Sequence, residues 1–295
     1  GRFYRGSTVG FAEVPDYVPR VAFARADQQD RGIRLLDLNG DGLPDIVYFR
    51  QGQSADKDEK GAYINTGSGW LPVAGLVPPK PFAADHITGN PVQFVDVDGD
   101  GFIDILYSYE RANGTKERGY YRNVPCDPNN PEDQKVCDPS RTWDPRIDRK
   151  WVLQEKSPGV PSDLAPPADF PFAKEGVGDL GVRIVDLNGD GRADIIVGYL
   201  PSKGSTGANE PVENCKTENG RQVCELNRQL FRVAAFLNDG SSWARSQDYD
   251  PPLPFVSQEA NAGGRTRDLF VQIIDVDGDR LPDIVAAFKH PYDNS

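Results

Sequence analysis

Four short segments of the chain share one pattern of apolar and polar residues. Each is an apolar run, a turn rich in Asp and Gly, and a second apolar run. The segments are RLLDLNGDGLPDIVYF (34–49), QFVDVDGDGFIDILYSY (93–109), RIVDLNGDGRADIIVGY (183–199) and QIIDVDGDRLPDIVAAF (272–288). Short apolar runs bounded by turn residues are typical of strands, so each segment predicts a β-hairpin.

The similarity extends beyond these hairpins and defines a longer repeat. Asp37 and Asp96 open consecutive turns 59 residues apart. The string YINTGSGW (63–70) recurs as FLNDGSSW (236–243), and PPKPF (78–82) recurs as PPLPF (251–255). One repeat has room for about four strands. In the first repeat these are expected at 33–37, 44–50, 61–65 and 69–73.

Two insertions, 110–150 and 200–230, lengthen the second and third repeats. Each insertion holds one close pair of cysteines, and neither pair has the spacing of a zinc or redox motif. We therefore expect the disulfides Cys126–Cys137 and Cys215–Cys224 rather than free thiols, formed in an oxidising compartment. Each disulfide would hold together a long surface loop without a core of its own.

A repeat of four strands fits one blade of a β-propeller. Residues 4–23 match the second half of a repeat, and residues 272–295 match the first half. We therefore predict a single all-β domain over 1–295, a closed four-bladed β-propeller in which a strand near 284–289 lies in the same sheet as one near 2–5. An arc of a larger propeller is the alternative. Because the chain begins at Gly1 without Met, we expect it to be part of a larger polypeptide.

The four turns, 37–45, 96–104, 186–194 and 275–283, read D-x-[DN]-x-D-G-x-x-D. Calcium binds about six to eight hard oxygen ligands in a flexible cage. Side chains at positions 1, 3, 5 and 9 and the backbone carbonyl at position 7 are therefore candidate ligands. These residues are Asp37, Asn39, Asp41, Leu43 and Asp45; Asp96, Asp98, Asp100, Phe102 and Asp104; Asp186, Asn188, Asp190, Arg192 and Asp194; and Asp275, Asp277, Asp279, Leu281 and Asp283.

Calcium explains the turns better than two simpler interpretations. An EF-hand needs Glu at position 12 and helical flanks, whereas position 12 here is Tyr48, Tyr107, Val197 or Ala286. Asp, Asn and Gly favour turns on their own, but four copies of the same oxygen positions favour about four calcium ions. Nothing nearby in the sequence neutralises the carboxylates. Arg280 replaces Gly at position 6, so the fourth site is expected to be the weakest.

These turns resemble the FG-GAP/VCBS repeats of integrin α-subunit propellers and of many bacterial surface proteins. The Asn-x-Gly-x-x-Trp and Pro-Pro-x-Pro-Phe elements resemble the propeller repeats of Rhs-type and insecticidal toxin-complex B proteins. The YD repeats of those toxin shells do not occur in the sequence. The resemblance implies that the turns are structural calcium sites and that the propeller serves adhesion or docking.

Composition narrows the possible functions. A net charge of −12 argues against nucleic acid or an anionic membrane as partner, and no apolar run reaches the length of a membrane span. Two histidines and the absence of G-x-S-x-G and H-E-x-x-H motifs argue against an enzyme. We expect a secreted or cell-surface binding module that contacts a protein or glycan through its insertions. A lectin or polysaccharide-active enzyme is the alternative, with Trp143 available to stack on a sugar.

Overall fold

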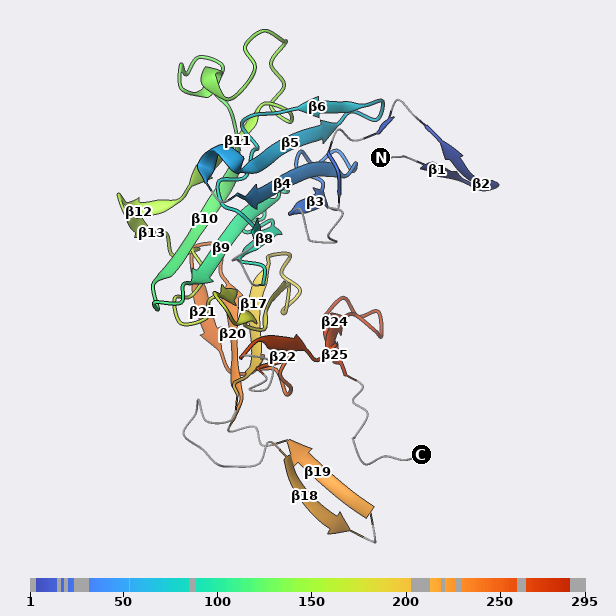
Figure 1. Cartoon of the computed structure of the whole chain (residues 1–295), viewed down its shortest axis with the longest axis vertical. Helices are drawn as coiled ribbons and strands as arrows, with labels where there is room; N and C mark the ends of the chain where they lie inside the picture. The colour runs from blue at the N-terminus through green and yellow to red at the C-terminus, as the bar shows by residue number, and fades with distance from the viewer. Residues whose placement is uncertain are drawn as a thin grey trace.

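The structure is a computed structural model that describes residues 4–14, 17–18, 21–23, 32–52, 54–84, 89–202, 213–218, 221–226, 230–258 and 264–286. Its regular elements are β-strands and two short 3₁₀-helices, η2 (Ala55–Lys57) and η3 (Asp133–Lys135). Three large sheets follow one another along the long axis, with smaller hairpins attached (Figure 1). None of the helices in these residues has the length and apolar character needed to cross a lipid bilayer.

The three large sheets share one topology. The first sheet contains β3 (Ile33–Leu36), β4 (Asp45–Gln51), β5 (Glu59–Asn65), β6 (Trp70–Pro72) and β7 (Ala83–Ala84). The second contains β8 (Val92–Val95), β9 (Asp104–Glu110), β10 (Lys116–Pro125), β11 (Arg149–Leu153), β14 (Ala173–Lys174) and β15 (Gly178–Asp179). The third contains β16 (Val182–Val185), β17 (Asp194–Leu200), β20 (Arg232–Asn238), β21 (Trp243–Ser246), β22 (Val256–Gln258) and β23 (Thr266–Asp268). The four strands predicted for the first repeat are confirmed.

Four hairpins form sheets of their own. They are β1 (Tyr4–Ser7) with β2 (Gly10–Glu13), β12 (Glu155–Ser157) with β13 (Val160–Pro161), β18 (Glu213–Glu218) with β19 (Arg221–Leu226), and β24 (Gln272–Ile274) with β25 (Asp283–Val285). In the first, third and fourth of these, both strands run antiparallel in continuous register, whereas β12–β13 contains an irregularity.

A short strand that the sequence did not predict completes each large sheet. β7, β14 and β22 return across their own sheets and pair in parallel with β4, β9 and β17. A buried Phe lies just before each return, and its backbone N–H donates to a carbonyl of the central strand. The donors and acceptors are Phe82 to Phe49 (3.2 Å), Phe172 to Ser108 (3.2 Å) and Phe255 to Gly198 (2.7 Å). The Pro-Pro-x-Pro-Phe element therefore anchors the end of a repeat to its middle.

The large sheets pack face to face, so their central strands are buried on both sides. Successive side chains of a strand point to opposite faces. In β9, Ile105 and Tyr107 join the core shared with the first sheet, whereas Leu106 joins the core shared with the third. In β17, Ile195 belongs to that second core, and Ile196 faces a third core that includes Ile273 and Ile284 of the C-terminal hairpin. Burial on both faces explains the continuous apolar runs in the sequence.

A buried Asn in the third strand of a repeat joins that repeat to the one before it. Asn123 Nδ2 donates to Leu38 O of the first repeat (2.9 Å) and to Ile103 O of its own repeat (3.1 Å). Asn238 Nδ2 makes the same pair of bonds to Val97 O (2.7 Å) and Ala193 O (3.2 Å). The Asn of the repeated Y/F-x-N string is therefore a link between neighbouring Asp-rich turns.

The predicted closure of a four-bladed ring is not found in the described part of the chain and stays a prediction, because residues 2–3 and 287–289 of the closing strands lie outside it. Within the described part, β1 pairs with β2 alone and β25 with β24 alone, and the two hairpins lie apart (Figure 1). Phe11 is 81% exposed and Ile274 is 57% exposed, so the apolar faces that closure would cover remain open. Gly6 occupies the place of the linking Asn and cannot make its bonds. The two half-repeats are thus not equivalent to one complete repeat.

The two insertions leave the sheets at opposite ends. The predicted bounds of the first insertion, 110–150, include strand β10 of the second sheet, so the inserted residues begin after Pro125. That end of β10 extends beyond the start of β9 and so lies beside the Asp-rich turn. The second follows β17, at the end far from its turn, and its hairpin β18–β19 extends away from the sheets (Figure 1). Where the structure describes them, the two insertions therefore lie at different ends of their sheets, and the recognition surface predicted for them stays a prediction.

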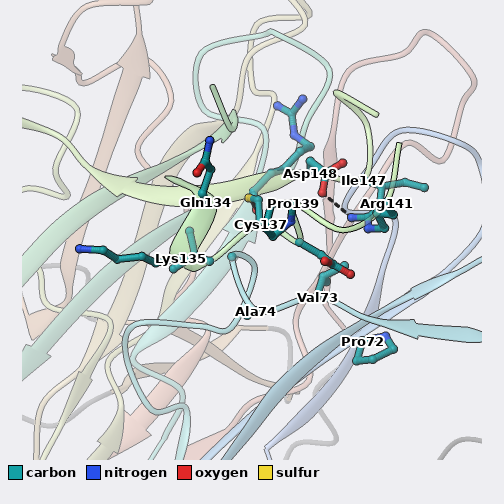
Figure 2. A pocket seen from close by; sticks show the side chains of 14 residues that line it. Pro72, Val73, Ala74, Gln134, Lys135, Cys137, Pro139, Arg141, Ile147 and Asp148 are labelled. Atoms are coloured by element: carbon teal, nitrogen blue, oxygen red, sulfur yellow. Dashed lines mark hydrogen bonds and ion pairs between the residues drawn. The ribbon is translucent and has the colours of Figure 1, made fainter. Parts of the chain in front are cut away.

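The predicted disulfide Cys126–Cys137 is confirmed. It closes a loop within the first insertion, and Cys137 lines a cavity of about 210 Å³ together with Pro72 of β6 and Val73. Arg141 and Asp148 form an ion pair in the wall of this cavity (Figure 2). Cys215 and Cys224 are opposite each other in the register of β18 and β19. Their side chains lie outside the described residues, so that disulfide stays a prediction.

Replacing Asn238 with Ala is expected to lower the free energy of unfolding by about 2–3 kcal/mol, because two buried carbonyls lose their donor. Urea unfolding measures this change. Asn129→Ala, at an exposed position of the first insertion, is the control and is expected to cost under about 0.5 kcal/mol. Equal effects of the two substitutions would contradict the linking role of Asn238.

Candidate metal centre

All four Asp-rich turns have nearly the same internal hydrogen bonds. In the second turn, the Asp96 carboxylate accepts from the backbone N–H groups of Gly99 (2.8 Å), Asp100 (3.2 Å) and Gly101 (2.8 Å). Asp98 then accepts from the N–H of Asp100 (3.2 Å), and Asp100 accepts from that of Phe102 (3.0 Å). Matching bonds occur in the first, third and fourth turns. The chain thus curls around the side chains at positions 1, 3 and 5.

The curl brings predicted ligands together. Carboxylate oxygens of Asp96, Asp98 and Asp100 lie within 4.8 Å of one another, as do those of Asp275, Asp277 and Asp283. In the first and third turns the corresponding set includes one amide, from Asn39 or Asn188. The donors are all hard oxygens without a thiolate or imidazole, which suits calcium. The carbonyls of Leu43, Phe102, Arg192 and Leu281 stay predicted ligands.

Asp at position 9 has a structural role that the sequence did not reveal. Asp45, Asp104 and Asp194 are fully buried at the start of the central strand of each sheet. Their Oδ2 atoms accept from the N–H at position 2, at 2.8, 3.2 and 2.8 Å respectively. Their Oδ1 atoms accept from the N–H of the repeat Asn, at 2.7, 2.8 and 2.7 Å. Each of these carboxylates therefore fixes the turn to the sheet, and Asp104 lies outside the oxygen cluster of Asp96, Asp98 and Asp100.

Position 6 requires a left-handed backbone conformation, as expected from its glycines. Gly42, Gly101 and Gly191 have φ angles of 84°, 86° and 85°, and Arg280 has 73°. A side chain in this region costs about 1–2 kcal/mol, so the fourth turn carries strain that the other turns avoid. Position 4 shares the requirement, which the sequence analysis missed. Its residues with positive φ are Gly40, Gly99, Gly189 and Gly278.

The turns lie in a row. A Cβ added to Gly40 in the first turn would lie 3.5 Å from Gly101 O in the second. Asn238 joins the second turn to the third through Val97 O. A Cβ added to Gly189 in the third turn would lie 3.0 Å from the Leu281 side chain in the fourth. Neighbouring turns therefore form one acidic ridge.

Burial raises the pKa of several carboxyl groups in the acidic ridge. Desolvation raises the pKa of Asp104 to about 7 and that of Asp45 to about 6, although backbone amides partly offset this. Burial also raises the pKa of Asp194 and of Asp98, and Asp98 is further affected by neighbouring Asp100. A bound divalent cation acts in the opposite direction because it stabilises the carboxylate form. The buried carboxylates thus fit a site that is completed by a cation.

Two arginines contact the turns, which corrects the expectation that nothing nearby neutralises them. Arg122 Nε forms an ion pair with Asp98 Oδ2, and its Nη2 lies 3.0 Å from Asp100 Oδ2. Arg192 Nη2 lies 3.0 Å from Asp190 Oδ2 in the third turn. Partial burial opposes the charge of Arg122, but the two carboxylates raise the pKa of its guanidinium overall.

Comparison with known proteins agrees with the geometry of the turns. Residues 37–107 match the FG-GAP-like repeat family. The matched stretch begins at position 1 of the first turn, after β3, and ends in β9, so it covers β4 to β8 and the first and second turns. The chain has no match among curated proteins.

One solved structure is distantly similar. It is described as a lectin of Agrocybe aegerita that recognises non-reducing terminal N-acetylglucosamine. The identity is 17% and the TM-score is 0.41, with 95% of this chain and 67% of the other covered. A likeness of that size carries no argument about the fold or the ligand of this chain.

The raised pKa values predict how metal-free protein responds to pH. A carboxyl group whose pKa is higher in the folded state holds its proton more tightly there, so its contribution to stability is lost as pH rises through that value. We expect the free energy of unfolding to fall from about pH 4, the usual pKa of Asp, to about pH 7, the raised pKa of Asp104, by about 1.4 kcal/mol for each unit of pKa shift.

Urea unfolding of protein stripped on a chelating resin measures this dependence. Asp104→Asn, which removes the group with the higher of the two pKa values, is the matched variant and is expected to show a flatter profile. A wild-type stability that is constant or rises over this range would contradict the interpretation.

Proposed function

We propose that the chain is a calcium-stabilised binding or docking module of propeller type, within a larger secreted or cell-surface polypeptide. The observation that carries the proposal is the row of four turns with matching hydrogen bonds and oxygen donors. Residues 37–107 match the FG-GAP-like repeat, which supports the same interpretation of the other turns because they repeat its sequence.

Calcium would act as a structural element at the junction of repeats. Positions 1, 3, 5 and 9 of each turn would supply side-chain oxygens, and position 7 a carbonyl. Because Asp104 also accepts from the N–H of Val97 and Asn123, an ion at the second turn would stiffen the start of β9. Asn123 would carry this effect to Leu38 in the first turn. Four such ions would order the ridge and offset its charge.

Docking would use the first insertion. Loops on a rigid scaffold often carry recognition, and this loop is held by Cys126–Cys137. Trp143 on the same insertion is 42% exposed, and its Nε1 donates to Cys126 O (3.2 Å), so the ring has a fixed attachment. An exposed, anchored Trp suits a protein or a glycan surface, and a glycan array distinguishes these partners. The resemblance to Rhs-type and toxin-complex B repeats favours docking within a toxin-type assembly.

Two further features enter the proposal. The disulfide fits an oxidising compartment, which supports secretion or display at the cell surface. The buried carboxylates at position 9 accept hydrogen bonds from backbone amides, a structural use that supports a non-enzymatic role for these turns.

Calcium is expected to raise the melting temperature by roughly 2–4 °C for each site it fills, because it binds the folded state alone. Differential scanning calorimetry in calcium and in EGTA measures the shift. Asp37→Asn removes position 1 of the first turn and is expected to reduce the shift. Asp163→Asn, at an exposed position away from the turns, is the control. Identical wild-type melting curves in the two buffers would contradict the proposal.

A further inference from the structure

Arg122 takes a position that is apolar in the other complete repeats. The corresponding residues are Ile64 in β5 and Leu237 in β20, and each of the three precedes the linking Asn of its repeat. Ile64 is buried and Leu237 is half-buried, so the fold accommodates an aliphatic side chain at this position. The second repeat thus has a charged group where its neighbours use packing.

The guanidinium of Arg122 contacts two of the predicted metal ligands. Its Nε forms an ion pair with Asp98 Oδ2, and its Nη2 lies 3.0 Å from Asp100 Oδ2. Asp98 and Asp100 occupy positions 3 and 5 of the turn and share a cluster of oxygens with Asp96. The Asp98 side chain is 16% exposed and that of Arg122 is 40% exposed, so solvent screens this ion pair in part. One guanidinium therefore engages the same carboxylates that a divalent cation would use.

A second basic residue near this turn does not share that role. Arg149 stacks over the Phe102 ring, with 3.4 Å between its Cζ and the ring centroid. Its guanidinium donates to the side chain and carbonyl of Asn123 and to Pro145 O. Arg149 therefore packs against the turn through Phe102, and its guanidinium donates to Asn123 and Pro145. The carboxylates of Asp98 and Asp100 are contacted by Arg122 instead.

The first turn provides the internal comparison. No Lys or Arg of the described chain contacts Asp37, Asp41 or Asp45, and the charges that act on Asp45 come from the other two carboxylates. Position 3 of the first turn is the uncharged Asn39, whose Nδ2 donates to Asp41 Oδ2 (3.0 Å), whereas position 3 of the second turn is Asp98. Two turns with nearly the same backbone bonds therefore differ at position 3 and, among the described residues, in the contact of an arginine with their carboxylates.

We propose that Arg122 is a built-in cation of the second turn, which holds Asp98 and Asp100 without metal and competes with calcium for them. The second turn then stays ordered in metal-free protein and fills at a higher calcium concentration than the first. Arg192 contacts one carboxylate of its turn, that of Asp190, while its Nε donates to Asn238 O, and it has the same effect to a smaller degree in the third turn. This inference rests on the proposed calcium sites.

Hydrogen–deuterium exchange of the full chain, read peptide by peptide across a calcium titration, separates the turns. In wild-type protein, the peptide covering 96–104 is expected to be protected in EGTA, and that covering 37–45 only when calcium is present. Arg122→Leu, which copies Leu237 of the third repeat, is expected to speed exchange of 96–104 in EGTA. It should also lower the calcium midpoint of that peptide by about tenfold, since removing one charge near a divalent ion is worth at least 1.4 kcal/mol. The peptide covering 37–45 should not change.

Matched variants exclude a general loss of stability. Arg118→Leu removes an arginine from the same strand, β10, whose guanidinium donates to Pro166 O (2.8 Å), and is expected to leave the midpoint unchanged. Arg122→Lys keeps the charge and should retain most of the wild-type midpoint. Arg122→Gln replaces Arg122→Leu if the latter does not fold.

The outcomes separate the two proposals. If calcium protects the turns but Arg122→Leu and Arg122→Gln leave the midpoint of 96–104 unchanged, the role of Arg122 is wrong and the calcium sites stand. If calcium protects no turn in any variant, the proposed calcium sites are wrong, and the role of Arg122 fails with them.

Discussion

The buried aspartate at the start of each central strand is the interaction on which the rest of the structure depends. Asp104 accepts from the N–H of Val97 within its turn and from the N–H of Asn123 in the third strand. Asn123 in turn donates to Leu38 of the preceding repeat. The carboxylate of Asp104 therefore connects the turn, the sheet and the neighbouring repeat. Burying a charged carboxylate costs free energy unless hydrogen bonds and a cation compensate the charge. Because the same arrangement recurs at Asp45 and Asp194, the packing of successive sheets and the position of the acidic ridge are two consequences of one constraint.

That constraint also explains why charge gathers on one side of the molecule. Each turn needs carboxylates at fixed positions to cap its own backbone amides, and stacking the repeats brings the turns into a row. The resulting repulsion grows with each added repeat, since carboxylates about 4 Å apart repel by several kcal/mol at the dielectric of a protein surface. Cations reduce this repulsion, whether they are bound ions or basic side chains such as Arg122. The structure thus links the stability of the repeats to the way their charge is neutralised.

Much of the fold followed from the sequence because its period was visible. The strands of the first repeat, the turns and the disulfide Cys126–Cys137 were predicted, since each depends on local pattern or short spacing. The returning strands β7, β14 and β22 were missed because they are two or three residues long and pair through tertiary contact. Ring closure was predicted from the spacing of aromatic residues. That spacing takes no account of Gly6, which lacks the side-chain amide by which Asn123 and Asn238 link neighbouring repeats. The contact of Arg122 with Asp98 was missed because it joins a strand to a turn, at a position where Ile64 and Leu237 are apolar.

Crystals grown in calcium chloride and measured at a wavelength where calcium scatters anomalously test the central claim most directly. The account predicts one anomalous peak at each of the four turns, about 2.3–2.6 Å from oxygens at positions 1, 3, 5, 7 and 9. It also predicts that Arg122 moves away from Asp98 and Asp100 when the second site fills. A well-ordered structure in saturating calcium that showed no metal at any turn would contradict it.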